Sequence, residues 1–355
     1  MKHKTQVFFA PKNDHICTRM EHVNHVASVS STISKYLGLN EQLSNAISLG
    51  HDIGHAPFGH HGESCINDIY KRYNPGEQFW HEKNSLLFAD FIETLQDPGG
   101  FERPLDLTYA VRDGIICHCG EIDENGLKPR SENRDLYKIE KAGQYQPYTW
   151  EGCVVKISDK ISYLGRDIED ARQYHIIDQQ SFGKLKELVR DTLGEKPDLT
   201  VNTTVLINEL IVDICNNSTP ETGLCFSENC FRFIRGIKKF NADHIYTYWK
   251  IEEFKKYTTL IINTIFESLL RTYPEVKKSR RYSGSEFFTR MDAAFREWLI
   301  KYTDFSPELK KEHNYATEVL FHIDDEGDYI RCIGTFISGM TDQFAIKTYE
   351  DLISF

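Results

Sequence analysis

The sequence predicts an all-α or nearly all-α protein, and three observations support this prediction. Apolar residues recur at helical spacing along most of the 355-residue chain. Strands and helices do not alternate as they do in a Rossmann fold, and the sequence has no glycine-rich phosphate-binding loop. Several expected helix starts and ends coincide with capping residues, Pro or Gly. We therefore expect packed helices rather than a central sheet.

The first half of the chain predicts four helices. Apolar spacing indicates a helix over 22–37 and a second over 41–50, which begins after a capping residue, Asn40. A third helix is expected over 81–95, before a Pro-Gly-Gly turn, and a fourth over 107–118. The second and third of these helices flank a histidine-rich segment.

The second half predicts one long loop and further helices. Residues 120–150 are rich in charge, Gly and Pro, which favours a loop. Helical patterning returns over 154–174 and over much of 180–270. The segment 327–352 begins as either a short strand or a helix and continues as a helix. The C-terminal half is therefore expected to be mainly helical.

We expect one domain of residues 1–355, with the candidate site in 1–175 and a helical extension in 176–355. Nine scattered cysteines without a C-x-x-C pair argue against a disulfide framework. The net charge of -11 gives no general attraction for nucleic acid or anionic membrane. No apolar run approaches the ~20 residues that span a bilayer, and the N-terminus lacks the apolar stretch of a secretory signal. These features predict a cytoplasmic protein.

The segment 50–63, GHDIGHAPFGHHGE, is the strongest candidate for a functional site. It holds four histidines and two carboxylates. Imidazole and carboxylate are ligands of Mn, Fe, Co, Ni, Zn and, less well, Mg, and the adjacent His51 and Asp52 let one turn offer two of them. Gly54 and Pro57 favour a curved backbone around a ligand. The alternative is a turn with incidental histidines, which this density disfavours.

Two other positions carry candidate side chains. His22 lies on the apolar stripe of its predicted helix, so it should be buried and need a polar partner. A lone buried histidine is usually a core residue, and a ligand role gains weight from the histidine-rich segment. His81 and Glu82 begin the helix over 81–95, where His81 can donate a proton and Glu82 can orient it. The alternative there is an exposed His-Glu pair at a helix start.

Asp159, Tyr163 and Asp167 recur every four residues and share one face of the helix over 154–174. Taken alone, this spacing favours an amphipathic helix with a solvated face. A tyrosine flanked by two carboxylates also suits contact with a sugar or base.

In chain order, His22, His51–Asp52 and Asp159 resemble the H…HD…D pattern of the HD superfamily. The fuller resemblance is to the dGTP triphosphohydrolases and the related vertebrate SAM/HD-domain dNTP hydrolases. Four further segments are similar to family segments: KTQVF at 4–8, GHDIGHAPFGHHGE at 50–63, LTYAVRDGI at 107–115 and GMTDQFA at 339–345. The resemblance spans nearly the whole chain and implies an HD-domain helical fold with additional C-terminal helices.

The resemblance also implies a role for each matching residue. The ligands of a divalent metal ion (Mn, Mg, Fe, Co or Ni) would be His22, His51, Asp52 and Asp159. The catalytic residues would be His60, Glu63 and, as a second candidate acid, His81. The residues that bind phosphate would be Arg19, His55 and Lys160, while the residues at the deoxyribose would be Tyr163 and, at its 3′-hydroxyl, Asp167.

The implied activity is hydrolysis of dGTP or another dNTP to deoxynucleoside and intact triphosphate, by a protein that is expected to be a homo-oligomer. Two alternatives stay open. One is another HD-family phosphohydrolase that acts on monophosphates or cyclic nucleotides. The other is a non-catalytic nucleotide-sensing subunit, suggested because the sequence before KTQVF does not show the FRRL-like segment that helps to close the nucleotide pocket in relatives. Binding of nucleic acid by the basic run 277–281 is disfavoured by the acidic balance.

Overall fold

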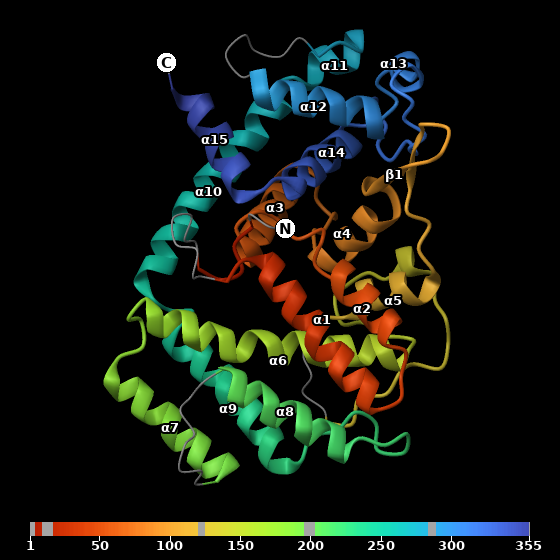
Figure 1. Cartoon of the computed structure of the whole chain (residues 1–355). Helices are drawn as coiled ribbons and strands as arrows, with labels where there is room; N and C mark the ends of the chain where they lie inside the picture. The colour runs from red at the N-terminus through yellow and green to blue at the C-terminus, as the bar shows by residue number, and fades with distance from the viewer. Residues whose placement is uncertain (1–3, 9–16, 120–124, 195–202, 283–288, 355) are drawn as a thin grey trace.

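The computed structural model describes residues 4–8, 17–119, 125–194, 203–282 and 289–354. Nearly all regular structure in these residues is helical, which confirms the predicted all-α class (Figure 1). The sheet is a single antiparallel hairpin of β1 (Thr94–Gln96) and β2 (Glu102–Pro104). The α-helices are α1 (Arg19–Tyr36), α2 (Glu41–Gly50), α3 (Gly59–Tyr73), α4 (His81–Leu87), α5 (Tyr109–Cys117), α6 (Trp150–Gln173), α7 (Gln179–Leu193), α8 (Thr203–Asn217), α9 (Glu228–His244), α10 (Trp249–Leu270), α11 (Tyr273–Ser279), α12 (Thr289–Tyr302), α13 (Pro307–Glu312), α14 (Glu326–Gly339) and α15 (Asp342–Ile353).

Local capping fixes the start of the helices that carry the site. Thr18 and Glu21 form a capping box at α1. The side chain of Asn40 accepts from the backbone N–H of Gln42 and Leu43, as its predicted capping role requires. Thr149 caps α6 in the same way. These contacts satisfy amide groups that the helix itself leaves unpaired.

The predicted helix over 81–95 is wrong at its end. α4 continues as a π-helical turn, Phe88–Ile92, and the chain then enters β1. The carboxylate of Asp97 accepts from the backbone N–H of Gly99 and Phe101, which favours a turn instead of a further helical residue.

Within 327–352 the structure has two helices, α14 and α15, so the segment begins as a helix and not as a strand. In 120–150 the described residues form turns and one 3-10 turn, Leu136–Lys138.

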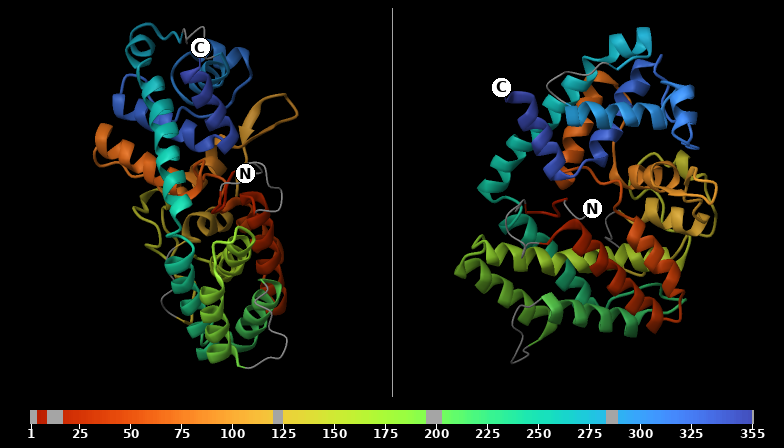
Figure 2. Two further views of the ribbon diagram at one scale, coloured as in Figure 1. Left: turned by 90° about the vertical axis from the view of Figure 1, so that its left-hand side faces the viewer. Right: turned by 45° about the horizontal axis from the view of Figure 1, so that its top comes forward.

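Two large apolar clusters lie on either side of the site. One joins α3, α10, α11, α12 and α14, and the other joins α1, α6, α7, α8 and α9. The long helix α10 runs between the lower and upper groups of helices (Figure 2). α6 packs on α1, α2 and α5, so the helices that bear the candidate residues meet near the middle of the molecule (Figure 1).

Among the described helices, none has both the length and the apolar character that crossing a membrane requires.

Candidate active site

Three predicted metal ligands converge from three helices. Nε2 of His22 on α1 lies 2.9 Å from Oδ1 of Asp159 on α6. Nε2 of His51, which follows the end of α2, lies 4.0 Å from the same oxygen. One ligand atom from each side chain lies within 4.8 Å of the others. The sequence pattern therefore predicted a real convergence of residues that are far apart in the chain.

The chemistry of this cluster suits a divalent cation. Nδ1 of His51 donates to the carbonyl of Ser48 at 2.6 Å, which leaves Nε2 with a free lone pair. Burial lowers the pKa of His51 to about 4, so the ring is neutral at pH 7, the form that binds metals. Burial acts to raise the pKa of Asp159, but His22 lowers it well below its usual range. Because metal–ligand bonds are about 2 Å long, these atoms are close enough to share one ion.

The fourth predicted ligand, Asp52, lies outside that group. Its carboxylate forms a buried ion pair with Arg19. Burial would raise the pKa of Asp52, but the Arg19 guanidinium holds it well below its usual range. A second nitrogen of Arg19 donates to the carbonyl of Thr5 at 3.3 Å. The structure therefore places Arg19, a predicted phosphate-binding residue, directly against a predicted metal ligand.

A second cluster joins His55, His60, Glu63 and His81. Oε2 of Glu63 lies 3.0 Å from Nδ1 of His81 and 3.6 Å from Nδ1 of His60. The rings of His55 and His81 stack with centroids 4.5 Å apart. The His60 side chain is 76% exposed, whereas that of His81 is 9% exposed. The cluster thus has one histidine at the surface above a buried group.

The charges in this cluster are opposite in sign and strongly coupled. Burial alone would raise the pKa of Glu63, but His60 and His81 lower it to about 2. Burial alone would lower the pKa of His81, but Glu82 and Glu63 raise it to about 10. His55 is buried, and burial lowers its pKa well below the usual range. At pH 7 a carboxylate and an imidazolium therefore lie beside a neutral imidazole, an arrangement that can hold and donate a proton. The alternative of an exposed His-Glu pair at 81–82 is wrong, since both residues are buried.

Close backbone packing fixes the turn between the two clusters. A Cβ on Gly54 would lie 2.3 Å from the backbone N of Ser85, so only glycine fits there. The N–H of Gly54 donates to the hydroxyl of Ser85 at 3.0 Å, and the amide of Asn84 donates to the carbonyl of Gly54. The turn is therefore attached to α4, which carries His81.

The N-terminal and C-terminal family segments hold the other side of this turn. The buried Lys4 amine donates to the carbonyls of His55 at 2.6 Å and Ser338 at 2.7 Å, and burial lowers its pKa to about 8. The carboxylate of Asp342 accepts from the backbone N–H of Thr5 at 2.8 Å and of Phe58 at 2.9 Å. Segments 4–8 and 339–345 therefore support the site although neither carries a predicted ligand.

The face of α6 beyond Asp159 is not solvated. Asp167 is buried and accepts from the hydroxyl of Tyr246, and burial raises its pKa to about 7. Tyr163 is partly buried and packs against the apolar cluster that joins α1, α6, α7, α8 and α9. Lys160 lines a narrow apolar slot with Phe226 and other residues between α6 and α9. The interpretation of an amphipathic helix with a solvated face is therefore wrong.

Sequence reasoning missed His118, which connects the two clusters. Its ring centroid lies 4.9 Å from that of His51 and 5.8 Å from that of His81. Nδ1 of His118 donates to the carbonyl of Ile115 at 2.6 Å, just as His51 does to Ser48. Both histidines directly follow a helix and bond to the carbonyl three residues earlier. This shared position was the signal that could have identified His118.

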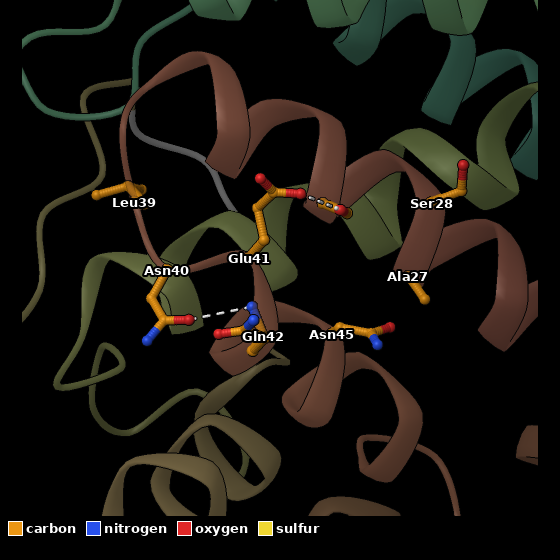
Figure 3. A pocket seen from close by; sticks show the side chains of 8 residues that line it. Ala27, Ser28, Leu39, Asn40, Glu41, Gln42 and Asn45 are labelled. Carbon is orange, nitrogen blue, oxygen red and sulfur yellow. Dashed lines mark hydrogen bonds between the residues drawn. The ribbon is translucent and has the colours of Figure 1, made fainter.

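A shallow groove is lined by residues outside these clusters. It has a volume of about 730 Å³ and lies between α1 and α2 (Figure 3). Its lining includes Ser28, Ser31 and Asn40, and contains none of the predicted site residues.

Comparison with known proteins agrees with this geometry. The HD domain family model matches residues 19–164, which include all three converging ligands. A deoxyguanosinetriphosphate triphosphohydrolase-like protein of Desulfatibacillum aliphaticivorans is 33% identical over 354 residues, 99% of this chain and 82% of the relative. The chain belongs to this family of HD-domain proteins. A protein of the same name from Caldanaerobacter subterraneus is 27% identical over 99% of this chain and 79% of the relative. Another from Ralstonia pickettii is 29% identical over 100% of this chain and 84% of the relative. The prediction of an HD-family phosphohydrolase is thereby confirmed.

Proposed function

We propose that the protein hydrolyses a deoxynucleoside triphosphate, with dGTP as the first candidate, to the deoxynucleoside and intact triphosphate. The observation that carries this proposal is the juxtaposition of two different clusters. His22, His51 and Asp159 offer ligands for a cation, and Glu63 with His81 offers a proton beside them. Relatives that align with 99% of this chain are named deoxyguanosinetriphosphate triphosphohydrolase-like proteins.

The cation would be a divalent metal held by His22, His51 and Asp159, with Asp52 joining if Arg19 turns toward substrate. When bound, it supplies Lewis-acid charge at the phosphate and lowers the pKa of a coordinated water. Arg19 and His55 lie next to this centre and would bind phosphate oxygens, Arg19 by charge-assisted hydrogen bonds. Lys160 would reach the outer phosphates from its slot beside α6.

Proton transfer is assigned to the second cluster. His60 or His81 would protonate the leaving 5′-oxygen, and Glu63 orients both rings. Such donation typically contributes ~10²–10⁴-fold in rate. Along α6, Tyr163 would contact the deoxyribose, and Asp167 would bind its 3′-hydroxyl.

The test is a panel of the four dNTPs and GTP with Mn²⁺ or Mg²⁺, with products separated by ion-exchange chromatography. Equal yields of deoxynucleoside and triphosphate are expected. Orthophosphate or a nucleoside monophosphate would instead indicate a different HD-family hydrolase. Tight nucleotide binding without any product would indicate a sensing subunit, and either result would contradict the proposal.

A further inference from the structure

We propose that Asp342 is a positioning residue for the proton-transfer pair of His60 and Glu63. Asp342 begins α15 and is 2% exposed. Its Oδ1 accepts from the backbone N–H of Phe58 at 2.9 Å, so it contacts a residue 284 positions earlier that lies just before His60. The inference rests on the proposed function, because it assigns how that pair is aimed.

The backbone at Phe58 is strained. Phe58 and Gly59 both adopt left-handed conformations, with φ of 65° and 67°. For a residue with a side chain such a conformation costs about 1–3 kcal/mol, and it persists only where the surroundings hold it. Phe58 is 3% exposed, and its ring packs against that of Phe254 with centroids 5.9 Å apart, so the core holds the side chain. The bond to Asp342 holds the amide of the same residue.

This turn sets the start of α3, which carries the proton-transfer pair. Phe58 is the N-cap of α3, and its apolar side chain gives the helix no capping hydrogen bond. Asp342 places a carboxylate at this helix end, where a negative charge is favourable. A Cβ on Gly62 would lie 1.9 Å from the carbonyl oxygen of Pro57, so the first turn of α3 packs directly against the residues before it. A shift of those residues would therefore move the proton-transfer pair.

Asp342 also contacts the N-terminal segment, but that segment has other attachments. Oδ2 of Asp342 accepts from the backbone N–H of Thr5 at 2.8 Å. The backbone N–H of Arg19 donates to the carbonyl of Lys4 at 3.0 Å, and the Lys4 amine donates to two further carbonyls. Loss of Asp342 should therefore act mainly on the turn before α3.

Steady-state kinetics on the full-length protein test this role. Asp342→Ala should lower kcat for dGTP with Mn²⁺ by about 10²-fold, since misplacing a catalytic group by about 1 Å can cost this much. KM and the affinity for Mn²⁺ should stay close to wild-type values, because the proposed metal ligands lie on α1, after α2 and on α6. Asp342→Asn keeps one acceptor oxygen, so it should give an intermediate kcat, and it provides the test if the alanine variant fails to fold.

The matched control is Asp304→Ala. The carboxylate of Asp304 also accepts from a backbone N–H, that of Ile323 at 2.9 Å, but it belongs to neither cluster. This variant should keep the wild-type kcat at a temperature where all the proteins are folded. Equal losses of kcat in Asp304→Ala and Asp342→Ala would indicate general destabilisation and would overturn the proposal. Wild-type kcat in both Asp342 variants, or a loss confined to KM, would overturn it too.

Hydrogen–deuterium exchange followed by mass spectrometry tests the positioning independently of activity. In Asp342→Ala the amides over 58–63 should exchange faster than in the wild type and in Asp304→Ala, because the anchor of the turn is lost. Unchanged exchange over 58–63 would overturn the inference. A wild-type protein that releases no triphosphate would contradict the proposed function, while faster exchange would still support Asp342 as the residue that fixes the start of α3.

Discussion

The two histidine clusters contain the same residue type but hold their protons in opposite ways. Burial dominates at His51 and lowers its pKa to about 4, whereas two carboxylates dominate at His81 and raise its pKa to about 10. One cluster therefore presents lone pairs to a cation, and the other presents a proton. Histidine titrates near neutral pH unless its surroundings shift it, so neighbouring side chains determine its role.

The sharpest way to break this comparison is to remove the shared carboxylate of the first cluster. Asp159→Asn should lower turnover by about 10³-fold or more, because the cation's Lewis-acid contribution amounts to several kcal/mol. The loss of turnover is measured as the steady-state rate of triphosphate release, and the exposed Asp351→Asn variant is the control. Activity close to wild type in a folded Asp159→Asn protein would show that the metal centre is assigned to the wrong residues.

Asp52 should behave differently, because its removal leaves the Arg19 charge buried and unpaired. Asp52→Ala should lower the free energy of unfolding by about 3–5 kcal/mol, in addition to any loss of turnover. Urea denaturation measures this effect. The double variant Arg19→Met and Asp52→Ala should recover part of the stability. Equal stabilities of the single variant and the wild type would contradict the buried ion pair.

The proton-transfer cluster should affect rate without affecting the proposed metal centre of His22, His51 and Asp159. His60→Gln and Glu63→Gln should each reduce kcat by about 10²-fold, since they remove or misorient a proton donor. Calorimetric titration with Mn²⁺ should give the same affinity for both variants as for the wild type and for the exposed control His322→Gln. A loss of Mn²⁺ binding in either variant would mean that the two clusters are not functionally separate.

The smallest predicted effect concerns Asp167. Burial raises the pKa of this residue to about 7, and its carboxylate accepts a hydrogen bond from the hydroxyl of Tyr246. An acid with a raised pKa in the folded state contributes stability that is present below pH 4 and is lost as pH rises through 7. Tyr246→Phe removes a donor to the ionised form, so it should cost about 1 kcal/mol at pH 5 and about 2 kcal/mol at pH 8. Denaturation of Tyr246→Phe and the control Tyr248→Phe at both pH values measures the difference. A cost independent of pH would contradict this assignment.

Local patterns predicted most of the helices, whereas the convergence of His22, His51 and Asp159 was predicted from the resemblance to the HD superfamily. Asn40 caps α2 because capping depends on neighbouring residues, and His22 turned inward because its stripe is apolar. Long-range pairings could not be predicted in the same way. The bond of Asp342 to Phe58 spans 284 residues, and the pairing of Asp52 with Arg19 depends on how α1 meets the end of α2. His118 escaped notice because its likeness to His51, a position directly after a helix, shows only when two distant segments are compared.

The most direct test of the central claim is hydrolysis of dGTP with Mn²⁺ in ¹⁸O-labelled water, followed by mass spectrometry of both products. If water attacks the α-phosphorus and the 5′-oxygen leaves with a proton from the histidine cluster, the label will appear in triphosphate and deoxyguanosine will be unlabelled. Label in deoxyguanosine, or formation of dGMP with pyrophosphate, would contradict the account.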